Sequence, residues 1–276
     1  MKALICTLFA LSLGLAVPAA DAQENTDRHP LLENDFMFSA GAFLNNKKIR
    51  LSVDGEEPSK EIEVSEAWGL DKDKTSAAMV FTWKFGEKWS VSGQYFSTDD
   101  SATATLDEDV EWEDWIFGEG SAVSAGVDLQ VARVFFGRTF HEGPNHDFVA
   151  GAGLHWIEIG AFLEGNAIIN GESVGSRRGS VSAAAPLPNI GAAYRYAFSP
   201  KWLLNTRLDW LHASFDEYSG GLWNGSAGIE YQAFKNVGFA LAYQVFKLDV
   251  DVKKDGWRGS ADLTYRGPFL SVTATW

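Results

Sequence analysis

The chain has 276 residues, with 37 acidic against 23 basic side chains and a formal net charge of −14. An acidic balance of this size disfavours nucleic acids and anionic surfaces as partners, and we expect no nucleic-acid ligand. The length suits one large all-β domain or two ordinary ones. Beyond residue 22 no stretch approaches 18 consecutive apolar residues, so we expect no transmembrane helix.

Residues 1–22 have the pattern of a cleaved secretory signal peptide. Lys2 supplies a short positive region, an apolar stretch runs from Ala3 to Val17, and Ala20-Asp21-Ala22 forms a cleavage site of the small-x-small type. The single cysteine, Cys6, lies inside this segment, so the predicted mature chain contains none. An exported protein without disulfides needs another source of stability, and backbone pairing in a closed sheet is one.

Between Asp35 and Trp276 the alternation of side-chain character predicts ten antiparallel strands. We expect short connections at 86–88, 141–145, 199–200 and 235–236, and longer or more acidic ones at 54–73, 107–120, 165–180, 216–219 and 253–256. Short and long connections therefore alternate along the chain. Eight or twelve strands are the alternatives, since residues 48–64 could hold a further hairpin.

The apolar face of the predicted strands changes side partway along their length. In the ninth strand Phe239, Leu241 and Tyr243 share one parity, whereas Phe246 and Leu248 continue the other. A β-bulge at one height in most strands would produce this switch. A straight strand whose outer face meets lipid below and water above produces it without any irregularity, and we favour that explanation. A local bulge stays an open alternative only at 186–188 and 267–268, where proline fits poorly into a ladder.

The last predicted strand ends on an aromatic residue. Leu270, Val272, Ala274 and Trp276 alternate with small polar residues. A strand of about 9–11 residues with one apolar face is what one wall of a transmembrane barrel needs. The sequence here resembles bacterial outer-membrane β-barrel proteins.

This resemblance implies a single all-β domain, an antiparallel transmembrane barrel with short periplasmic turns and longer outer loops. We assign 1–22 to the signal peptide, 23–34 to a short periplasmic tail and 35–276 to the barrel. The implied location is the cell outer membrane. The implied partners are outer-membrane lipid, lipopolysaccharide and the barrel assembly machinery, which would read the strand ending at Trp276. We expect a monomer.

A narrower resemblance rests on four short segments: 66–71 (EAWGLD), 216–221 (DEYSGG), 248–251 (LDVD) and 258–260 (RGS). These segments are similar to those of a family of ten-stranded outer-membrane proteins whose activity is uncharacterised. The resemblance covers nearly the whole predicted mature chain. It implies fold and location, and it brings no activity with it.

Two groups of inward-facing residues are candidate sites. The upper lumen carries apolar residues that form either a packed core or a pocket for a hydrophobic ligand. Its candidate ligand-binding residues are Leu129, Ile157, Ile159, Leu211, Phe215, Phe246, Leu248, Trp257, Leu263 and Tyr265. The lower lumen carries Arg195, Arg207, Asp209, Glu230 and His155. These polar residues form either a conduit or gate, or a network whose charges neutralise one another. We favour the network, because isolated charges in a narrow lumen are costly.

We expect no cofactor, no metal site and no enzymatic activity. The acidic segment 107–115 lacks the glycine-bearing spacing of a calcium loop, and a solvated acidic loop is the simpler interpretation. His155 points inward near Asp209, but no serine or carboxylate pair accompanies it as catalysis would require.

The sequence therefore favours a small barrel that is much narrower than the 16–18-stranded porins. We expect it to bind or pass a small hydrophobic or amphipathic molecule through an apolar upper lumen. A closed structural or surface-interaction barrel with acidic outer loops is the alternative, and a barrel-embedded hydrolase is a weaker one.

Overall fold

The structure of the protein is a computed structural model that describes residues 28–54, 62–63, 74–106, 110–112, 115–169, 172–215, 218–254 and 257–276. The predicted signal peptide lies outside the described residues. So do most of the first predicted outer loop and residues 107–109 and 113–114 of the acidic segment.

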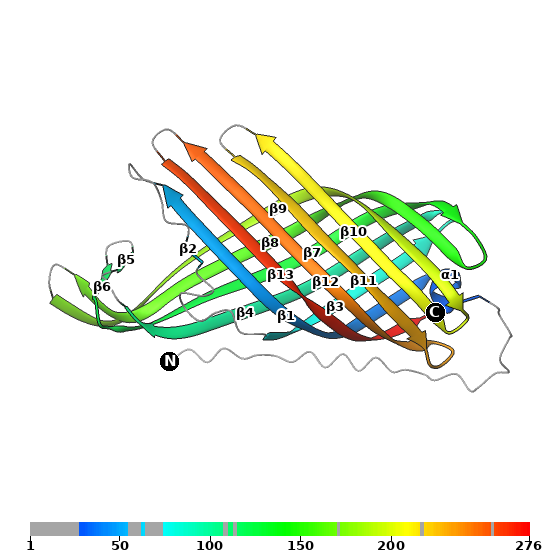
Figure 1. Cartoon of the computed structure of the whole chain (residues 1–276), viewed down its shortest axis with the longest axis horizontal. Helices are drawn as coiled ribbons and strands as arrows, with labels where there is room; N and C mark the ends of the chain where they lie inside the picture. The colour runs from blue at the N-terminus through cyan, green and yellow to red at the C-terminus, as the bar shows by residue number, and fades with distance from the viewer. Residues whose placement is uncertain are drawn as a thin grey trace.

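Ten long antiparallel strands close into a barrel (Figure 1). They are β1 (Phe36–Asp54), β3 (Lys74–Phe85), β4 (Trp89–Thr105), β7 (Ala122–Glu142), β8 (His146–Ile169), β9 (Glu172–Ser199), β10 (Trp202–Phe215), β11 (Tyr218–Gln232), β12 (Val237–Lys254) and β13 (Trp257–Thr275). Neighbours in sequence pair with one another, and β1 pairs with β13. The predicted fold and strand number are confirmed.

The remaining described elements are short. A four-residue helix, α1 (Pro30–Glu33), precedes β1. The strands β2 (Ile62–Glu63), β5 (Val110–Trp112) and β6 (Trp115–Phe117) lie at the long-loop end, where β6 pairs with the end of β8 and β5 pairs with β6. β2 pairs with the upper part of β1, so the hairpin considered for residues 48–64 adds no barrel strand within the described residues. None of the described helices is long and apolar enough to cross a membrane.

The predicted short connections are tight turns. The first is made at Gly86, whose φ of 59° lies in the left-handed region that glycine adopts without strain. Helix α1 and the C-terminus lie at this end of the barrel (Figure 1), which is the periplasmic end in outer-membrane barrels.

The prediction of a long connection at 165–180 was wrong. Residues 165–180 are almost entirely strand, because β8 and β9 stay paired from His146 and Tyr196 as far as Ile169 and Glu172. The small polar residues of this segment resemble a loop in composition. Pairing with β8 satisfies their backbone groups and holds them in a strand.

The strands run straight through the point at which the apolar parity changes. β12 pairs with both neighbours from end to end without a change of register. On its outer face Tyr243 is 51% exposed, whereas Phe246 on the inner face is 2% exposed. One geometry, with lipid below and water above on the outer face, therefore accounts for the switch.

The two proline sites, at which a local bulge was the open alternative, show no shift of register among the described residues. Pairing of β13 continues in one register on both sides of Gly267-Pro268. A Cβ atom at Gly267 would lie 1.9 Å from the Leu44 carbonyl oxygen, so glycine there allows the neighbouring strand to approach closely. Pro186 and Pro188 keep their register with β8. Among the described residues, β9 has no partner on its other side at that height, and such an edge is where a strand tolerates proline.

The outer wall has an apolar belt with aromatic residues at both edges. Trp83, Trp89 and Trp202 are exposed near the short turns, and Trp210 and Trp223 are exposed at the upper edge. Trp223 pairs with Lys247, which forms ion pairs with Asp249 and Asp262 on the outer face. The wall therefore changes from apolar to charged directly above the upper aromatic edge, as expected where a strand leaves the bilayer.

Candidate functional site: the filled lumen and its apolar cup

Helix α1 closes the periplasmic end of the lumen. Leu31 and Leu32 are buried against Ala197 and Leu203. Lys84 Nζ donates to the carbonyl oxygens of Leu31 and Leu32 at 2.9 and 3.1 Å. The described part of the predicted periplasmic tail is thus a plug that lies inside the mouth of the barrel.

Arg195 joins the plug to the wall. Its guanidinium forms a bidentate pair with Asp147 at 2.8 and 2.5 Å and donates to the Leu31 carbonyl oxygen at 3.0 Å. Nearby, Asn205 donates to Glu230 at 3.0 Å. Above this level lies a cavity of about 130 Å³ that Arg133, Arg195, Arg207 and Glu230 help to line. It is large enough for several ordered waters.

His29 caps α1, and its surroundings shift the pKa of its imidazole. Its Nδ1 accepts from the Leu31 N–H at 3.2 Å, and the side chain is fully buried. Burial, and then the positive charge of Arg195, lower the pKa of His29 to about 4. Undocked, His29 should have the ordinary pKa of about 6.5, so the docked state binds the proton less tightly than the undocked state. Docking is therefore most favourable above pH 6.5, and it weakens as the pH falls from 6.5 toward 4.

We therefore expect acidification to release α1. Between pH 7.5 and 5 the docking free energy should fall by about 2 kcal/mol. A nitroxide on Glu33→Cys, an exposed site of α1, should become more mobile over this range. In His29→Asn, which keeps a capping acceptor but does not titrate, the label should stay immobile. Equal pH dependence in both variants would contradict this role of His29.

A layer of hydrogen-bonded polar side chains closes the lumen above the cavity. At its centre is Asp209, which is fully buried. It accepts from Arg133 Nη2 at 2.7 Å and from Arg207 Nη1 at 3.0 Å. Two guanidinium groups therefore share one carboxylate, so these three side chains carry a formal charge of +1 and neutralise one another only in part.

Amide side chains extend this polar layer across the barrel. Arg207 donates to Gln94 at 2.8 Å, and Gln94 donates to Gln244 at 3.3 Å. Asn224 donates to His155 Nε2 at 2.8 Å, and the Nδ1–H of His155 donates to Asn189 Oδ1 at 3.0 Å, which fixes a neutral imidazole. We call these residues, with Arg133, Arg207 and Asp209, the polar layer.

The five residues predicted to form one charge network lie in two separate layers of the lumen. His155, Arg207 and Asp209 belong to the polar layer, whereas Arg195 and Glu230 lie below it, on the other side of the cavity. Sequence parity places all five side chains inward. Their heights follow from the register between strands, which the sequence pattern does not contain.

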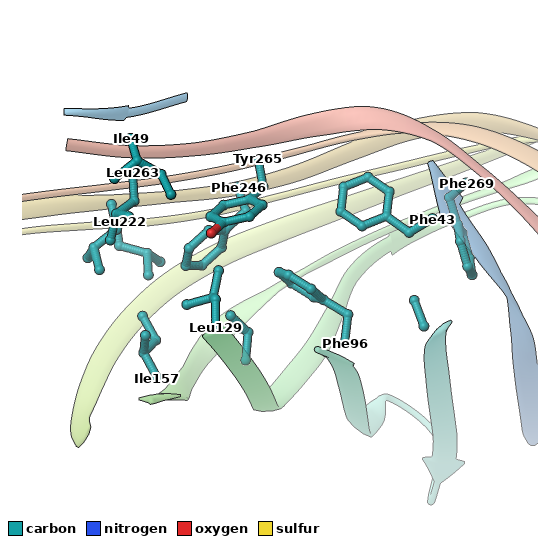
Figure 2. Packing of buried hydrophobic residues seen from close by; sticks show 13 residues of the cluster. Phe43, Ile49, Phe96, Leu129, Ile157, Leu222, Phe246, Leu263, Tyr265 and Phe269 are labelled. Atoms are coloured by element: carbon teal, nitrogen blue, oxygen red, sulfur yellow. The ribbon is translucent and has the colours of Figure 1, made fainter. Parts of the chain in front are cut away.

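Above the polar layer, apolar side chains fill the lumen (Figure 2). The ring of Phe96 lies edge-on between those of Phe43 and Phe246, with centroids 5.7 and 5.8 Å away. The buried members are Phe43, Ile49, Ala78, Phe96, Leu129, Val131, Ile157, Leu222, Phe246, Leu248, Leu263, Tyr265 and Phe269.

Five partly buried residues pack against this cluster: Val127, Ile159, Leu187, Leu211 and Val250. Val127, Ile159 and Val250 are the next inward residues beyond Leu129, Ile157 and Leu248 toward the outer end. Burial therefore decreases from the cluster to these three residues, while the polar layer closes the other side. Farther out on β7, Val123 is fully buried again. We call the cluster and these five residues the apolar cup.

Most of the predicted upper-lumen residues meet in the cup. Leu129, Ile157, Phe246, Leu248, Leu263 and Tyr265 are buried in it, and Ile159 and Leu211 are partly buried against it. The side chains of Phe215 and Trp257 lie outside the described residues. Sequence reasoning missed Phe43, Phe96 and Leu222, although each lies on the inward parity of its strand.

The described residues assemble no catalytic group around the histidines. Both ring nitrogens of His155 are engaged by amides, and His212 is exposed on the outer face. Asp216, which sequence places near His212, lies outside the described residues.

The closed ten-stranded sheet, its apolar outer belt and its filled lumen define an integral outer-membrane β-barrel that is not a porin. No protein-family model and no curated protein matches the chain. Among solved structures, the outer membrane protease OmpT from Escherichia coli is similar, with a TM-score of 0.57, 10% identity, and 89% of this chain and 97% of OmpT covered.

Two other solved barrels give lower scores. The outer membrane protein OprG from Pseudomonas aeruginosa has a TM-score of 0.38 and 10% identity, with 90% of this chain and 98% of OprG covered. The toluene transporter TodX from Pseudomonas putida has a TM-score of 0.35 and 10% identity, with 90% and 92% covered. The likeness to OmpT shows the fold alone.

Proposed function

We propose that this barrel binds a small hydrophobic or amphipathic molecule in the apolar cup. The observation that carries the proposal is an apolar cluster inside the barrel that is closed toward the periplasm and whose outer members Val127, Ile159 and Val250 are only partly buried. Apolar cavities with few polar groups are the usual sites for such ligands.

The two closures below the cup favour binding over passage along the axis. A molecule moving toward the periplasm would have to break the Asp209 ion pairs and then displace α1. Breaking a buried ion pair costs several kcal/mol. The engagement of His155 by two amides also favours a binding protein over a hydrolase.

A closed structural barrel is the second candidate. The observation in its favour is the packing of the cluster, in which Leu129 and Phe246 are 0% and 2% exposed. In that case the cup is a hydrophobic core whose role is stability.

Native mass spectrometry with lipid extraction separates the two candidates. Protein purified gently from its own membrane should carry a stoichiometric apolar adduct, and the mass of the adduct would identify its class. Ile159→Gln, at the outer side of the cup, should lower occupancy at least about tenfold, because it places an unpaired amide among apolar groups. Glu158→Gln, the adjacent outward residue, is the matched control. A clean apo mass for the wild type, together with no conductance in planar bilayers, would support the closed barrel instead.

A further inference from the structure

The barrel wall is not continuous around the cup. β9 and β10 pair only up to Ile190 and Trp210. Beyond that pair β9 stays joined to β8, and β10 stays joined to β11 as far as Phe215 and Tyr218. In Figure 1 the outer parts of β8 and β9 diverge from those of β10 and β11. We call the facing edges of 182–189 and 211–214 the seam.

Exposure shows that the seam is open. Ala183, Ala185 and Ala213 lie on the inward parity of their strands and are nevertheless exposed. In a continuous wall such inward residues would be covered by the neighbouring strand and the lumen side chains. Both faces of β9 are therefore accessible beside the cup.

A second break in pairing is bridged, and the contrast makes the seam distinctive. β3 and β4 pair only up to Ala78 and Phe96, but Lys74 beyond them forms an ion pair with Asp99 at 3.2 Å. Lys47 on β1 likewise pairs with Asp100 on β4. Among the described residues, no hydrogen bond or ion pair crosses the seam between β9 and β10.

Two prolines keep the edge of β9 from being completed. Pro186 and Pro188 lie in the seam and have no backbone N–H to donate to a partner strand. If β10 continued to pair with β9 in the register of Ile190 and Trp210, the next four residues of β9 would be 189 to 186. Two of these four residues are prolines and could not donate a backbone hydrogen bond.

The seam joins the upper edge of the lipid belt to the cup. Ile190 and Trp210, 58% and 40% exposed on the outer face, mark its lower end. Leu187 and Leu211, one from each edge, pack against the apolar cluster. Apolar side chains therefore stand both at the lipid-facing lower end of the seam and on its lumen side.

Small polar side chains flank this apolar path. Ser182 and Ser214 are exposed on the two edges, above Leu187 and Leu211, and His212 is exposed beside them. A molecule whose chain lies between the two leucines would keep a polar end at the level of these groups, near the membrane surface.

We propose that the seam is a lateral entry site, at the level of the membrane surface, through which the cup takes a single-chain amphiphile that leaves the outer leaflet. The inference rests on the proposed function and adds the ligand class and its source. The apolar chain passes between Leu187 and Leu211, and the polar end stays among the residues above them.

A reversible disulfide across the seam tests the route. If the pairing of Ile190 with Trp210 continued, Ala213 would lie opposite Leu187, and the predicted mature chain offers no other thiol. We would compare Leu187→Cys/Ala213→Cys with Ala192→Cys/Leu208→Cys, whose residues already pair below the seam. The probe is perdeuterated lauric acid added to vesicles containing the barrel, with occupancy followed by native mass spectrometry.

Oxidation of the seam pair should slow uptake of the probe at least about tenfold, and reduction should restore it. Oxidation of the control pair should change nothing. If the seam disulfide does not form, Leu211→Trp should slow uptake by filling the seam, with the outward Leu208→Trp as its control.

The failures are distinguishable. Equal uptake with the seam closed would overturn the lateral route and leave the cup as a binding site reached from the outer mouth. No uptake of laurate by a wild-type protein that carries a native apolar adduct would overturn the ligand class. Absence of any adduct would overturn the proposed function itself.

Discussion

Replacing Asp209 with asparagine should destabilise the folded barrel by about 3–5 kcal/mol, the usual cost of removing one partner of a buried ion pair. Asp209 is fully buried and accepts from both Arg133 and Arg207. Asparagine keeps the shape of the side chain but leaves two buried guanidinium groups without a carboxylate. Urea-dependent unfolding from lipid vesicles would measure the difference in the free energy of unfolding.

Asp99→Asn is the matched control for this substitution. Asp99 also forms an ion pair, with Lys74, but its side chain is 88% exposed. Exposed pairs contribute less than about 1 kcal/mol, because water solvates the charges almost as well. A double variant, Asp209→Asn with Arg133→Gln, should recover part of the loss, since it removes one of the unpaired charges. Equal effects at Asp99 and Asp209 would contradict a buried network.

Loss of the Asp209 carboxylate should also weaken the closure of the lumen. The cavity under the polar layer is lined by Arg133 and Arg207, the two partners of Asp209. Without the Asp209 carboxylate, the two guanidinium groups should turn toward the water of the cavity, which can solvate their charges. This movement would open the polar layer that separates the cup from the periplasmic half of the lumen. Measurable ion conductance in planar bilayers for Asp209→Asn, but not for wild type, is the expected consequence.

The alternation of apolar and polar side chains along each strand shows which side of the wall each residue faces. This local pattern was sufficient to predict the fold. Tyr243 and Phe246 stand three residues apart in one strand, and their parity alone predicted lipid for the first and lumen for the second. Period 2 is a local property of the backbone, so the sequence contains it. The members of the cup share the inward parity, and so do Phe43 and Phe96, although these two were not among the residues predicted for the site.

The heights of the side chains and the breaks in the wall depend on non-local pairing. Arg195 and Arg207 have the same parity on adjacent strands, yet the register pairs Arg195 with Asn205 and Arg207 with Ala193, which separates them along the barrel. No pattern within either strand specifies that offset. The seam is a similar case, because the small residues before Pro186 do not reveal whether a strand has one partner or two.

Val250 and Asp249 provide a direct test of the straight strand through the membrane surface. Val250 is partly buried against the cup, and Asp249 lies on the outer face beside Lys247. Val250→Asp should cost about 3 kcal/mol or more, since it places a carboxylate without a partner among apolar groups. Asp249→Leu should change stability by less than about 1 kcal/mol, because only a surface ion pair is lost.

Refolding into detergent, followed by the shift in gel mobility between folded and heated protein, would score both variants, and urea unfolding would give the magnitudes. If Val250→Asp refolded normally while Asp249→Leu did not, the inner and outer faces of β12 would be reversed above the aromatic edge. The cup would then lose Leu248 and Val250. The outcome of this pair of substitutions therefore decides whether an apolar compartment exists at the height where the ligand is proposed to enter.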